Sequence, residues 1–223
     1  MPDPITNPKN FIKENTRPSG TPLLGDRIQL FLACEDLPLW NHGEEELDKL
    51  GLDTPFWAFA WAGGQALAQY ILDNPELVEG KRVLDFACGC GLQGIAAKKA
   101  GAKDVLAVDI DPLATAATEL NANLNNVDIT TSTDNLVGKD DQGWDLILAG
   151  DVCYEGPMAN EITLWLKSLS SKGTKVLIGD PGRTYLPKTG LRKLIAYCVK
   201  TSSSLEDTDV RSAVVWEFEP RVE

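Results

Sequence analysis

The chain has 223 residues, of which 43% are hydrophobic and 24% are charged, a composition that favours one ordered globular domain spanning residues 1–223. Its 33 acidic and 21 basic side chains give a net charge of -12, which repels phosphate backbones and argues against a nucleic-acid partner. No stretch approaches the ~20 apolar residues of a membrane span, and residues 1–20 lack the apolar run of a secretory signal. We therefore expect a cytoplasmic protein without a membrane partner.

The first 54 residues are expected to form an N-terminal extension. Asn7 followed by Pro8 predicts the start of a short helix over residues 9–16. The sequence TRPSGTPLLG (residues 16–25) is typical of a turn-rich linker, whereas the alternation in RIQLFLACED (residues 27–36) indicates a strand. A second short helix is predicted in EEELDKLGLD, with its end at Gly51.

A regular alternation of elements begins at Gly63. A helix is predicted from there up to Pro75, and five apolar strands follow, separated by helical segments. The expected strands are RVLDFA, DVLAVD, VDITTS, WDLILAGD and TKVLIGD. Strands and helices in alternation predict βαβ units and a parallel sheet. The tail differs, because YCVKTSSSL and DVRSAVVWEFE have no helix between them, so we expect an antiparallel hairpin at one edge of the sheet.

The sequence VLDFACGCG (residues 83–91) allows two interpretations, a thiol site or a backbone cradle for a ligand. Metal binding by Cys88 and Cys90 requires further ligands, and the chain offers only His42 and three scattered cysteines. A disulfide between two residues of one tight turn has poor geometry. We therefore expect no metal and two small, packed thiols.

The glycines of the same stretch favour the cradle. Gly89, Gly91 and Gly94 spell G-x-G-x-x-G between a predicted strand and a predicted helix, where backbone N–H groups can turn toward a ligand. The pattern usually accompanies a dinucleotide, with an acid about 20 residues later on the ribose. Asp109 lies at that distance, so ribose binding is indicated whichever nucleoside is bound.

Asp85 bears on which nucleoside is bound. Its carboxylate ends the strand four residues before Gly89, where it would repel a pyrophosphate and attract an ammonium. An acid, a glycine turn and a second acid match the amine and the ribose hydroxyls of S-adenosylmethionine. The alternative role for Asp85 is a helix cap, and for Asp111, directly before Pro112, the cap is the favoured interpretation.

Four segments together resemble the seven-β-strand methyltransferases, and most of all the protein lysine methyltransferases that modify the β-subunit of electron transfer flavoprotein. They are PFWAFAWAGGQALAQYILDNP, VLDFACGCG, VLAVDIDP and LAGDVCYE, within a similarity from about Pro55 to Trp216. One departure is Ala87, where many relatives have glycine. The resemblance implies a Rossmann-like doubly wound α/β fold with a mostly parallel seven-stranded sheet. It also implies S-adenosylmethionine as cofactor and a protein substrate, to whose binding residues 1–54 contribute.

The resemblance also assigns the acceptor side of the site. Asp151 and Tyr154 form D-x-x-Y after the fourth predicted strand, and this motif is similar to the substrate-facing motif of that group. A bare carboxylate raises the pKa of a lysine, so Asp151 is expected to anchor and orient the incoming cation, while Tyr154 lines its channel. The alternative is a tyrosine buried under a loop, with the aspartate as a turn residue.

Further cofactor-binding residues follow from the resemblance alone. Trp61 corresponds to a tryptophan beside the cofactor, although it also fits a core cluster with Phe56, Trp57 and Phe59. The full set expected to bind the cofactor is Trp61, Asp85, Ala87, Gly89, Gly91, Asp109, Asp134, Asn135 and Gly150. Arg183 and Tyr185 fall at the same end of the sheet, and for them a plain turn is the commoner explanation.

The expected activity is therefore transfer of methyl groups from S-adenosylmethionine to a protein lysine. Modification of a ribosomal protein or of a small amine is the alternative within methyltransferases. An NAD-dependent oxidoreductase and a catalytically silent binding module are the alternatives from other classes.

Overall fold

A computed structural model describes residues 6–41, 43–140, 142–201 and 208–219. His42, considered above as a metal ligand, lies outside these residues. Within the described ranges no helix is both long and apolar enough to cross a bilayer.

The central feature is a seven-stranded sheet in the order β5-β4-β3-β6-β7-β9-β8. Five strands pair in parallel: β3 (Arg82–Phe86), β4 (Asp104–Val108), β5 (Thr130–Ser132), β6 (Leu146–Gly150) and β7 (Lys175–Asp180). The last two, β8 (Leu191–Lys200) and β9 (Val210–Phe218), form an antiparallel pair whose β9 also runs antiparallel to β7. The predicted α/β fold with its edge hairpin is confirmed, although β8 begins six residues earlier than expected.

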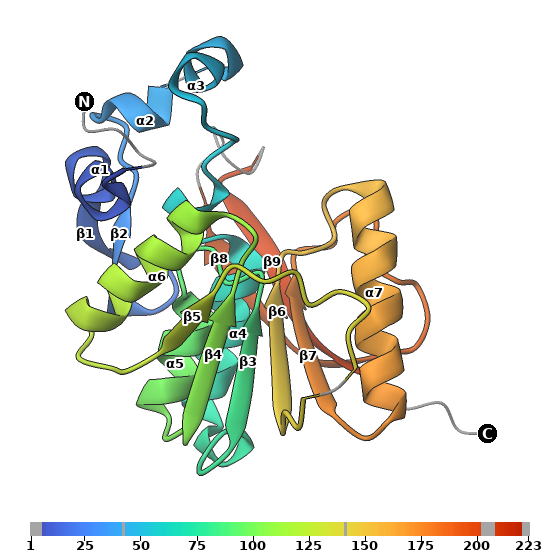
Figure 1. Cartoon of the computed structure of the whole chain (residues 1–223). Helices are drawn as coiled ribbons and strands as arrows, with labels where there is room; N and C mark the ends of the chain where they lie inside the picture. Colours follow the sequence, from blue (N-terminus) through green and yellow to red (C-terminus); the bar gives the residue numbers. More distant parts are fainter. Residues whose placement is uncertain (1–5, 42, 141, 202–207, 220–223) are drawn as a thin grey trace.

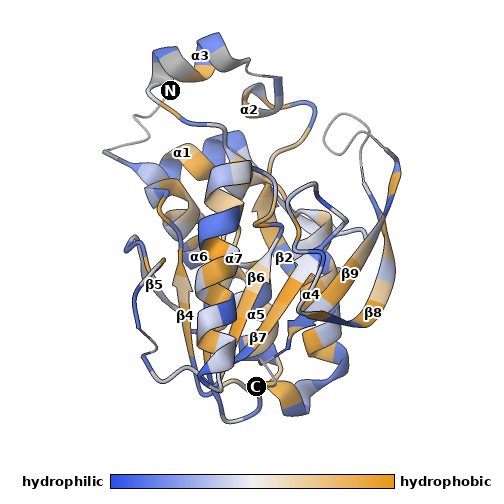
Figure 2. Ribbon diagram, turned by 90° about the vertical axis from the view of Figure 1, so that its right-hand side faces the viewer, coloured by the Kyte–Doolittle hydropathy of each residue, from blue (hydrophilic) through white to orange (hydrophobic). Residues whose placement is uncertain are grey.

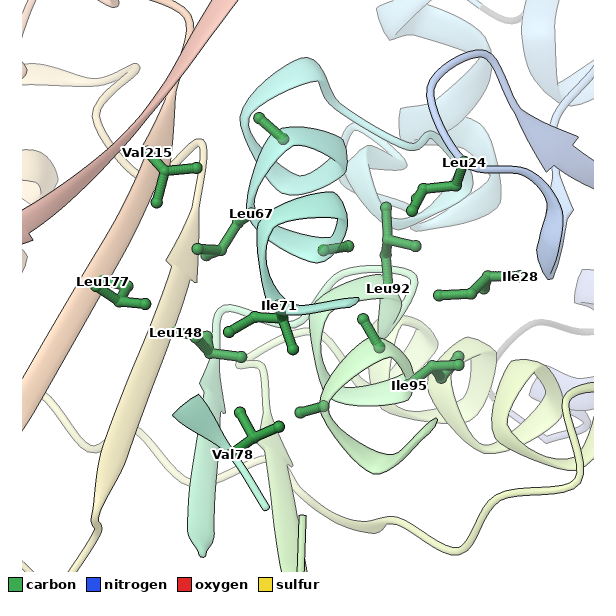
Figure 3. Close-up of a cluster of buried hydrophobic side chains, with 14 of the residues drawn as sticks. Leu24, Ile28, Leu67, Ile71, Val78, Leu92, Ile95, Leu148, Leu177 and Val215 are labelled. Carbon is green, nitrogen blue, oxygen red and sulfur yellow. The ribbon is translucent and has the colours of Figure 1, made fainter. Parts of the chain in front are cut away.

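Helices cover both faces of this sheet. Helices α4 (Ala62–Asp73) and α5 (Leu92–Lys99) lie behind it in Figure 1, and α7 (Gly156–Ser171) lies in front. Leu67 and Ile71 of α4 meet Leu148, Leu177 and Val215 of the sheet in one buried cluster (Figure 3). Strands β6 and β7, covered on both sides, are apolar along most of their length (Figure 2), as expected of buried parallel strands.

The N-terminal extension packs against α6 (Pro112–Leu124) at one end of the molecule (blue in Figure 1). Its elements are α1 (Pro8–Asn15), β1 (Arg17–Thr21), β2 (Gly25–Leu32), α2 (Pro38–Asn41) and α3 (Glu44–Leu50). Outside the extension, the 3₁₀ turn η1 (Phe56–Ala58) precedes α4 and the 3₁₀ turn η2 (Pro75–Leu77) follows it. Asn7 caps α1 as predicted, because its side chain accepts the N–H of Asn10. The extension is tied to α6 by side-chain amides: Asn121 accepts the N–H of Phe31 at 2.7 Å, and Asn125 accepts that of Gln29 at 3.1 Å.

The prediction of a linker at residues 16–25 is wrong. Residues Arg17–Thr21 form β1, which pairs antiparallel with β2. The cause is tertiary: Ile28 and Leu30 of β2 are fully buried against α4 and α5, which leaves an edge of β2 that a second strand can cover. Proline and glycine weaken a strand signal but are tolerated in a strand at the sheet edge, so the local sequence of β1 was misleading.

Candidate functional site

The carboxyl ends of the parallel strands bring most of the predicted site residues to one edge of the sheet. The turn between β3 and α5 carries the glycine pattern. Gly91 is the N-cap of α5 with φ 76°, and a Cβ there would lie 2.7 Å from Thr118, so this glycine serves helix packing. Gly89 has φ 52° and would place a Cβ no closer than 3.9 Å to any atom, so its backbone faces open space that a ligand can approach.

Ala87 departs from the expected glycine at a position where glycine has a physical advantage. Its φ is 52°, in the left-handed region where a Cβ crowds the following carbonyl and costs roughly 1–2 kcal/mol. The conformation, more than the size of the turn, is therefore the physical reason for the glycine that the resemblance implies here.

Asp85 combines the two roles considered for it. It is fully buried, and its Oδ2 accepts the N–H of Gly94 in the first turn of α5 at 2.8 Å, while Oδ1 has no hydrogen-bond partner. Burial raises its pKa to about 8, and the nearby charge of Asp109 adds to the shift. The carboxylate thus lies beneath the glycine turn as a cap with one unused oxygen, and its attraction for an ammonium stays a prediction.

Asp109 joins the ends of β3 and β4. Its Oδ2 accepts the N–H of Gly89 at 2.9 Å and its Oδ1 accepts that of Asp111 at 3.1 Å. The side chain is only partly buried, and this burial raises its pKa. Each oxygen keeps a lone pair for a hydroxyl donor such as a ribose. Asp111 caps α6 by accepting the N–H of Leu113 at 2.8 Å, as predicted.

The two cysteines of the turn are packed thiols. Cys88 and Cys90 are buried and unbridged, and burial raises the pKa of Cys88 well above its ordinary value and that of Cys90 to about 12. Within the ranges that the structure describes, no three His, Cys, Asp or Glu residues gather as metal ligands do. Nothing in this geometry favours a thiolate site.

Asp134 and Asn135 lie exposed in the loop after β5. Asp134 accepts the hydroxyl of Ser132 at 2.9 Å, and Asn135 accepts the N–H of Val137 at 3.0 Å. These contacts shape the loop, and the binding of an adenine by this pair stays a prediction.

Gly150 and Asp151 end β6 against the start of α4. A Cβ on Gly150 would lie 2.9 Å from the Cα of Gly64, so only glycine allows this close approach. Asp151 is 6% exposed and has φ 57°, a left-handed conformation that aspartate tolerates better than most residues. The helix start and the strand end are therefore held in direct contact.

Asp151 is not a bare carboxylate. Its Oδ1 accepts two hydrogen bonds from the guanidinium of Arg183, at 2.7 Å from Nη2 and 3.1 Å from Nε, and its Oδ2 accepts the N–H of Gly64 at 2.8 Å. Burial outweighs these contacts and raises the pKa of Asp151 to about 6. Sequence reasoning left Arg183 as a turn residue, yet it is the main partner of the predicted acceptor anchor.

The turn after β7 explains how Arg183 reaches this place. Asp180 is buried at the strand end, and its Oδ1 accepts the N–H groups of Gly182 and Arg183, each at 2.7 Å. This is the Asx-type turn that the sequence GDPGR is suited to form. The signal was visible as a turn, but its target, Asp151, could be known only from the fold.

Three rings, Phe56, Trp61 and Tyr154, form what we call the aromatic wall. The ring centroids of Phe56 and Tyr154 are 5.2 Å apart, and those of Phe56 and Trp61 are 6.0 Å apart. The guanidinium of Arg183 lies 5.6 Å from the ring centroid of Trp61. Tyr154 is 43% exposed, so the alternative of a buried tyrosine is excluded, and in the suggested core cluster only Trp57 is fully buried.

The donor set suits a nucleoside that carries an ammonium. An open backbone at Gly89 and two acceptor oxygens on Asp109 offer places for a sugar diol, and the buried Asp85 beneath the turn keeps one oxygen without a partner. A pyrophosphate at this turn would meet the charge of Asp109 and would oppose the ionisation of Asp85. The residues present therefore fit S-adenosylmethionine better than a dinucleotide.

Comparisons with known proteins agree with this geometry. Residues 65–152 match the family of ribosomal protein L11 methyltransferases, PrmA. The chain is 40% identical to the electron transfer flavoprotein beta subunit lysine methyltransferase of Danio rerio, over 94% of this chain and 83% of the relative. It is 41% identical to the protein of the same name from Xenopus laevis, over 96% and 88%.

Among solved structures, magnesium protoporphyrin IX methyltransferase from Synechocystis PCC 6803 with bound SAM has a similar fold, with a TM-score of 0.52, 16% identity, and coverage of 70% of this chain and 77% of the other. Because 40–41% of the residues are identical over almost the whole length of the chain, it belongs to the electron transfer flavoprotein beta subunit lysine methyltransferase family.

Proposed function

We propose that this protein transfers methyl groups from S-adenosylmethionine to a lysine side chain of the electron transfer flavoprotein β-subunit. The observation that carries the proposal is the extent of the match. The similarity to lysine methyltransferases covers 96% of the chain and so includes most of the N-terminal extension. The match to ribosomal protein L11 methyltransferases stops at residue 152, before Tyr154 and Arg183, and omits Trp61.

On the cofactor side, the residues of the chain bind and orient the cofactor. S-adenosylmethionine, when bound, supplies a methyl group on a positively charged sulfur. Asp109 accepts hydrogen bonds from the ribose hydroxyls, the open backbone at Gly89 allows close approach, and Asp85 holds the turn from beneath through the N–H of Gly94. The remaining residues of the proposed cofactor site are Trp61, Ala87, Gly91, Asp134, Asn135 and Gly150.

On the acceptor side, the chain must favour a neutral amine. A lysine has a pKa of about 10.4, so at pH 7 only roughly one molecule in 2,500 is the nucleophilic amine. Desolvation lowers the pKa of an amine, and the aromatic wall offers an apolar surface for the lysine stem. Tyr154 can hold the amine through its hydroxyl, so that positioning for in-line displacement supplies most of the acceleration.

The N-terminal extension contributes to protein recognition in this proposal. A cavity of about 290 Å³ lies between β1, β2 and the segment before α4, and Trp40, Phe59, Trp61 and Lys200 help to line it. Trp40 packs edge-on against Phe59 with ring centroids 5.4 Å apart, and the ring centroids of Phe59 and Trp61 are 5.8 Å apart. Since Trp61 also belongs to the aromatic wall, the cavity borders that wall, and residues flanking the target lysine can bind in it.

The decisive test is labelled methyl transfer. Purified protein with S-adenosylmethionine should label recombinant electron transfer flavoprotein β-subunit at lysine, located by mass spectrometry, and should leave ribosomal protein L11 unlabelled. S-adenosylmethionine at 100 times its dissociation constant should add about 2.7 kcal/mol of stability, whereas NAD should add none. Labelling of L11 instead, or stabilisation by NAD alone, would overturn the proposal.

The Trp40→Ala variant tests the role of the extension. We expect a higher KM for the protein substrate with unchanged cofactor affinity, because Trp40 lines the cavity and not the glycine turn. An unchanged KM would remove the cavity from substrate recognition.

A further inference from the structure

The acceptor end of the site contains a buried ion pair between Asp151 and Arg183, and the D-x-x-Y motif alone does not predict it. The side chain of Asp151 is 7% exposed and that of Arg183 is 20% exposed, and both guanidinium contacts fall on one carboxylate oxygen. The other oxygen is engaged by the N–H of Gly64. An acceptor lysine therefore meets a carboxylate whose charge is already balanced.

This balance decides what the carboxylate does to an amine. An opposite charge within about 4–6 Å shifts a pKa by one to three units toward the charged form, so a bare Asp151 would hold the lysine as an unreactive ammonium. A carboxylate paired with arginine, which stays protonated at any accessible pH, exerts little of this effect. We infer that Arg183 is a positioning residue that neutralises Asp151, so that the acceptor site retains the substrate lysine in its neutral, nucleophilic form.

The surroundings of Arg183 hold it in this role. Its backbone N–H is fixed by Asp180, and its guanidinium lies over the ring of Trp61, an arrangement that favours a cation at this spot. Besides Arg183, the titratable groups that act on Asp151 or share its surroundings are Asp180 at the end of β7 and Cys153, while α4 contributes the N–H of Gly64. The same guanidinium thus links the aromatic wall to the carboxylate.

This role of Asp151 differs from the one that the resemblance implies, in which the carboxylate anchors the incoming lysine cation directly. In the structure it anchors Arg183 and the start of α4, and the contact with the acceptor nitrogen is left to Tyr154 and to the apolar faces of the rings. This inference rests on the proposed methyl transfer.

The test is the pH profile of kcat, which reports ionisation in the enzyme–substrate complex. We expect kcat to rise with pH as the substrate lysine loses its proton, and the midpoint is the pH at which kcat reaches half of its maximum. In Arg183→Gln an unpaired carboxylate should raise this midpoint by roughly one to three pH units and lower kcat at pH 7.5 by about tenfold or more. In Asp151→Asn an unpaired guanidinium should move the midpoint down. The double variant, with no charge at either position, should return the midpoint close to that of the wild type.

Several results would overturn the inference. A residue that only supports the fold would lower kcat at every pH and leave the midpoint in place, and so would count against it. Midpoints of the two single variants that move in the same direction, or a double variant that keeps the shift of Arg183→Gln, would also contradict it. Arg183→Lys keeps a charge but loses the two-pronged contact, so it should keep the wild-type midpoint at a reduced rate.

Failure of the proposed function is distinguishable from failure of the inference. If the wild-type enzyme methylates no lysine, the proposed function fails; if it does and the midpoints coincide, the inference alone fails. A substrate-free measurement covers the first case. The free energy of unfolding of Arg183→Gln should fall more steeply than that of the wild type as pH rises from 6 to 8, because the unpaired Asp151 carboxyl gains a higher pKa, and the double variant should not share this steeper fall. Parallel curves would overturn the pairing itself.

Discussion

Replacement of Asp85 by asparagine measures how much the ionisation of this buried carboxyl beneath the glycine turn lowers the free energy of unfolding. The ordinary pKa of 3.8 is raised to about 8 by burial, so the folded state binds this proton more tightly than the unfolded state does. Such a group destabilises the fold progressively as pH rises from about 4 to about 8, and the full penalty applies above pH 8. In the Asp85→Asn variant the amide oxygen would still accept the N–H of Gly94, but the side chain would not titrate.

The expected magnitude follows from the shift. Between pH 6 and pH 8 the ionisation of one such carboxyl lowers the free energy of unfolding by roughly 2 kcal/mol, since one pKa unit corresponds to about 1.4 kcal/mol. In a protein of this size that amounts to a decrease in Tm of about 4–8 °C. Asp151, with a pKa of about 6, contributes in the same direction but over a lower pH range.

The assay is urea unfolding of the cofactor-free protein at pH 6, 7 and 8, with Asp85→Asn and the wild type side by side. We expect the difference between the two curves to grow by about 2 kcal/mol from pH 6 to pH 8 in favour of the variant. Asp128→Asn, at an exposed site, is the matched control and should run parallel to the wild type. Equal slopes for wild type and Asp85→Asn would refute the assignment of a raised pKa to Asp85.

Three further predictions concern the turn and its thiols. Gly89→Ala and Gly80→Ala share a positive φ and open space around the added Cβ, so calorimetry should show similar stability losses of about 1 kcal/mol but a weaker affinity for S-adenosylmethionine in Gly89→Ala alone. Ala87→Gly should raise the free energy of unfolding by about 1 kcal/mol because it relieves a left-handed alanine, whereas Ala196→Gly, in an exposed strand, should lower it; a loss in both would contradict the strain. Iodoacetamide at neutral pH should alkylate the exposed Cys198 and spare the buried Cys88, Cys90 and Cys153, whose pKa values are raised by burial, and mass spectrometry would detect any early labelling that contradicts this.

The sequence predicted the sheet well because burial on both faces leaves a strong local mark. The apolar runs of β3, β4, β6 and β7 need no partner to be recognised, and the caps at Asn7 and Asp111 depend on neighbours within three residues. The signal failed for β1, since the stability of that strand comes from the edge of β2 and not from its own residues.

The site divides in the same way. The glycine turn and Asp109 follow from spacing along the chain, and their contact was foreseeable. The pair between Asp151 and Arg183 was not, because the two residues are 32 positions apart and meet only through the turn at Asp180. Asp85 lies between these cases: its position was foreseen, and its simultaneous service as a helix cap was an open alternative.

The amide contacts from Asn121 and Asn125 to β2 have a consequence for how the N-terminal extension could be exchanged. A segment on a flexible tether is easily exchanged between proteins, but here the N-terminal extension shares hydrogen bonds with two asparagines that lie 90 and 96 positions downstream. A chimera that imports residues 1–54 from another enzyme would need the matching asparagines as well. The extension and the helix that carries these asparagines therefore change together or not at all.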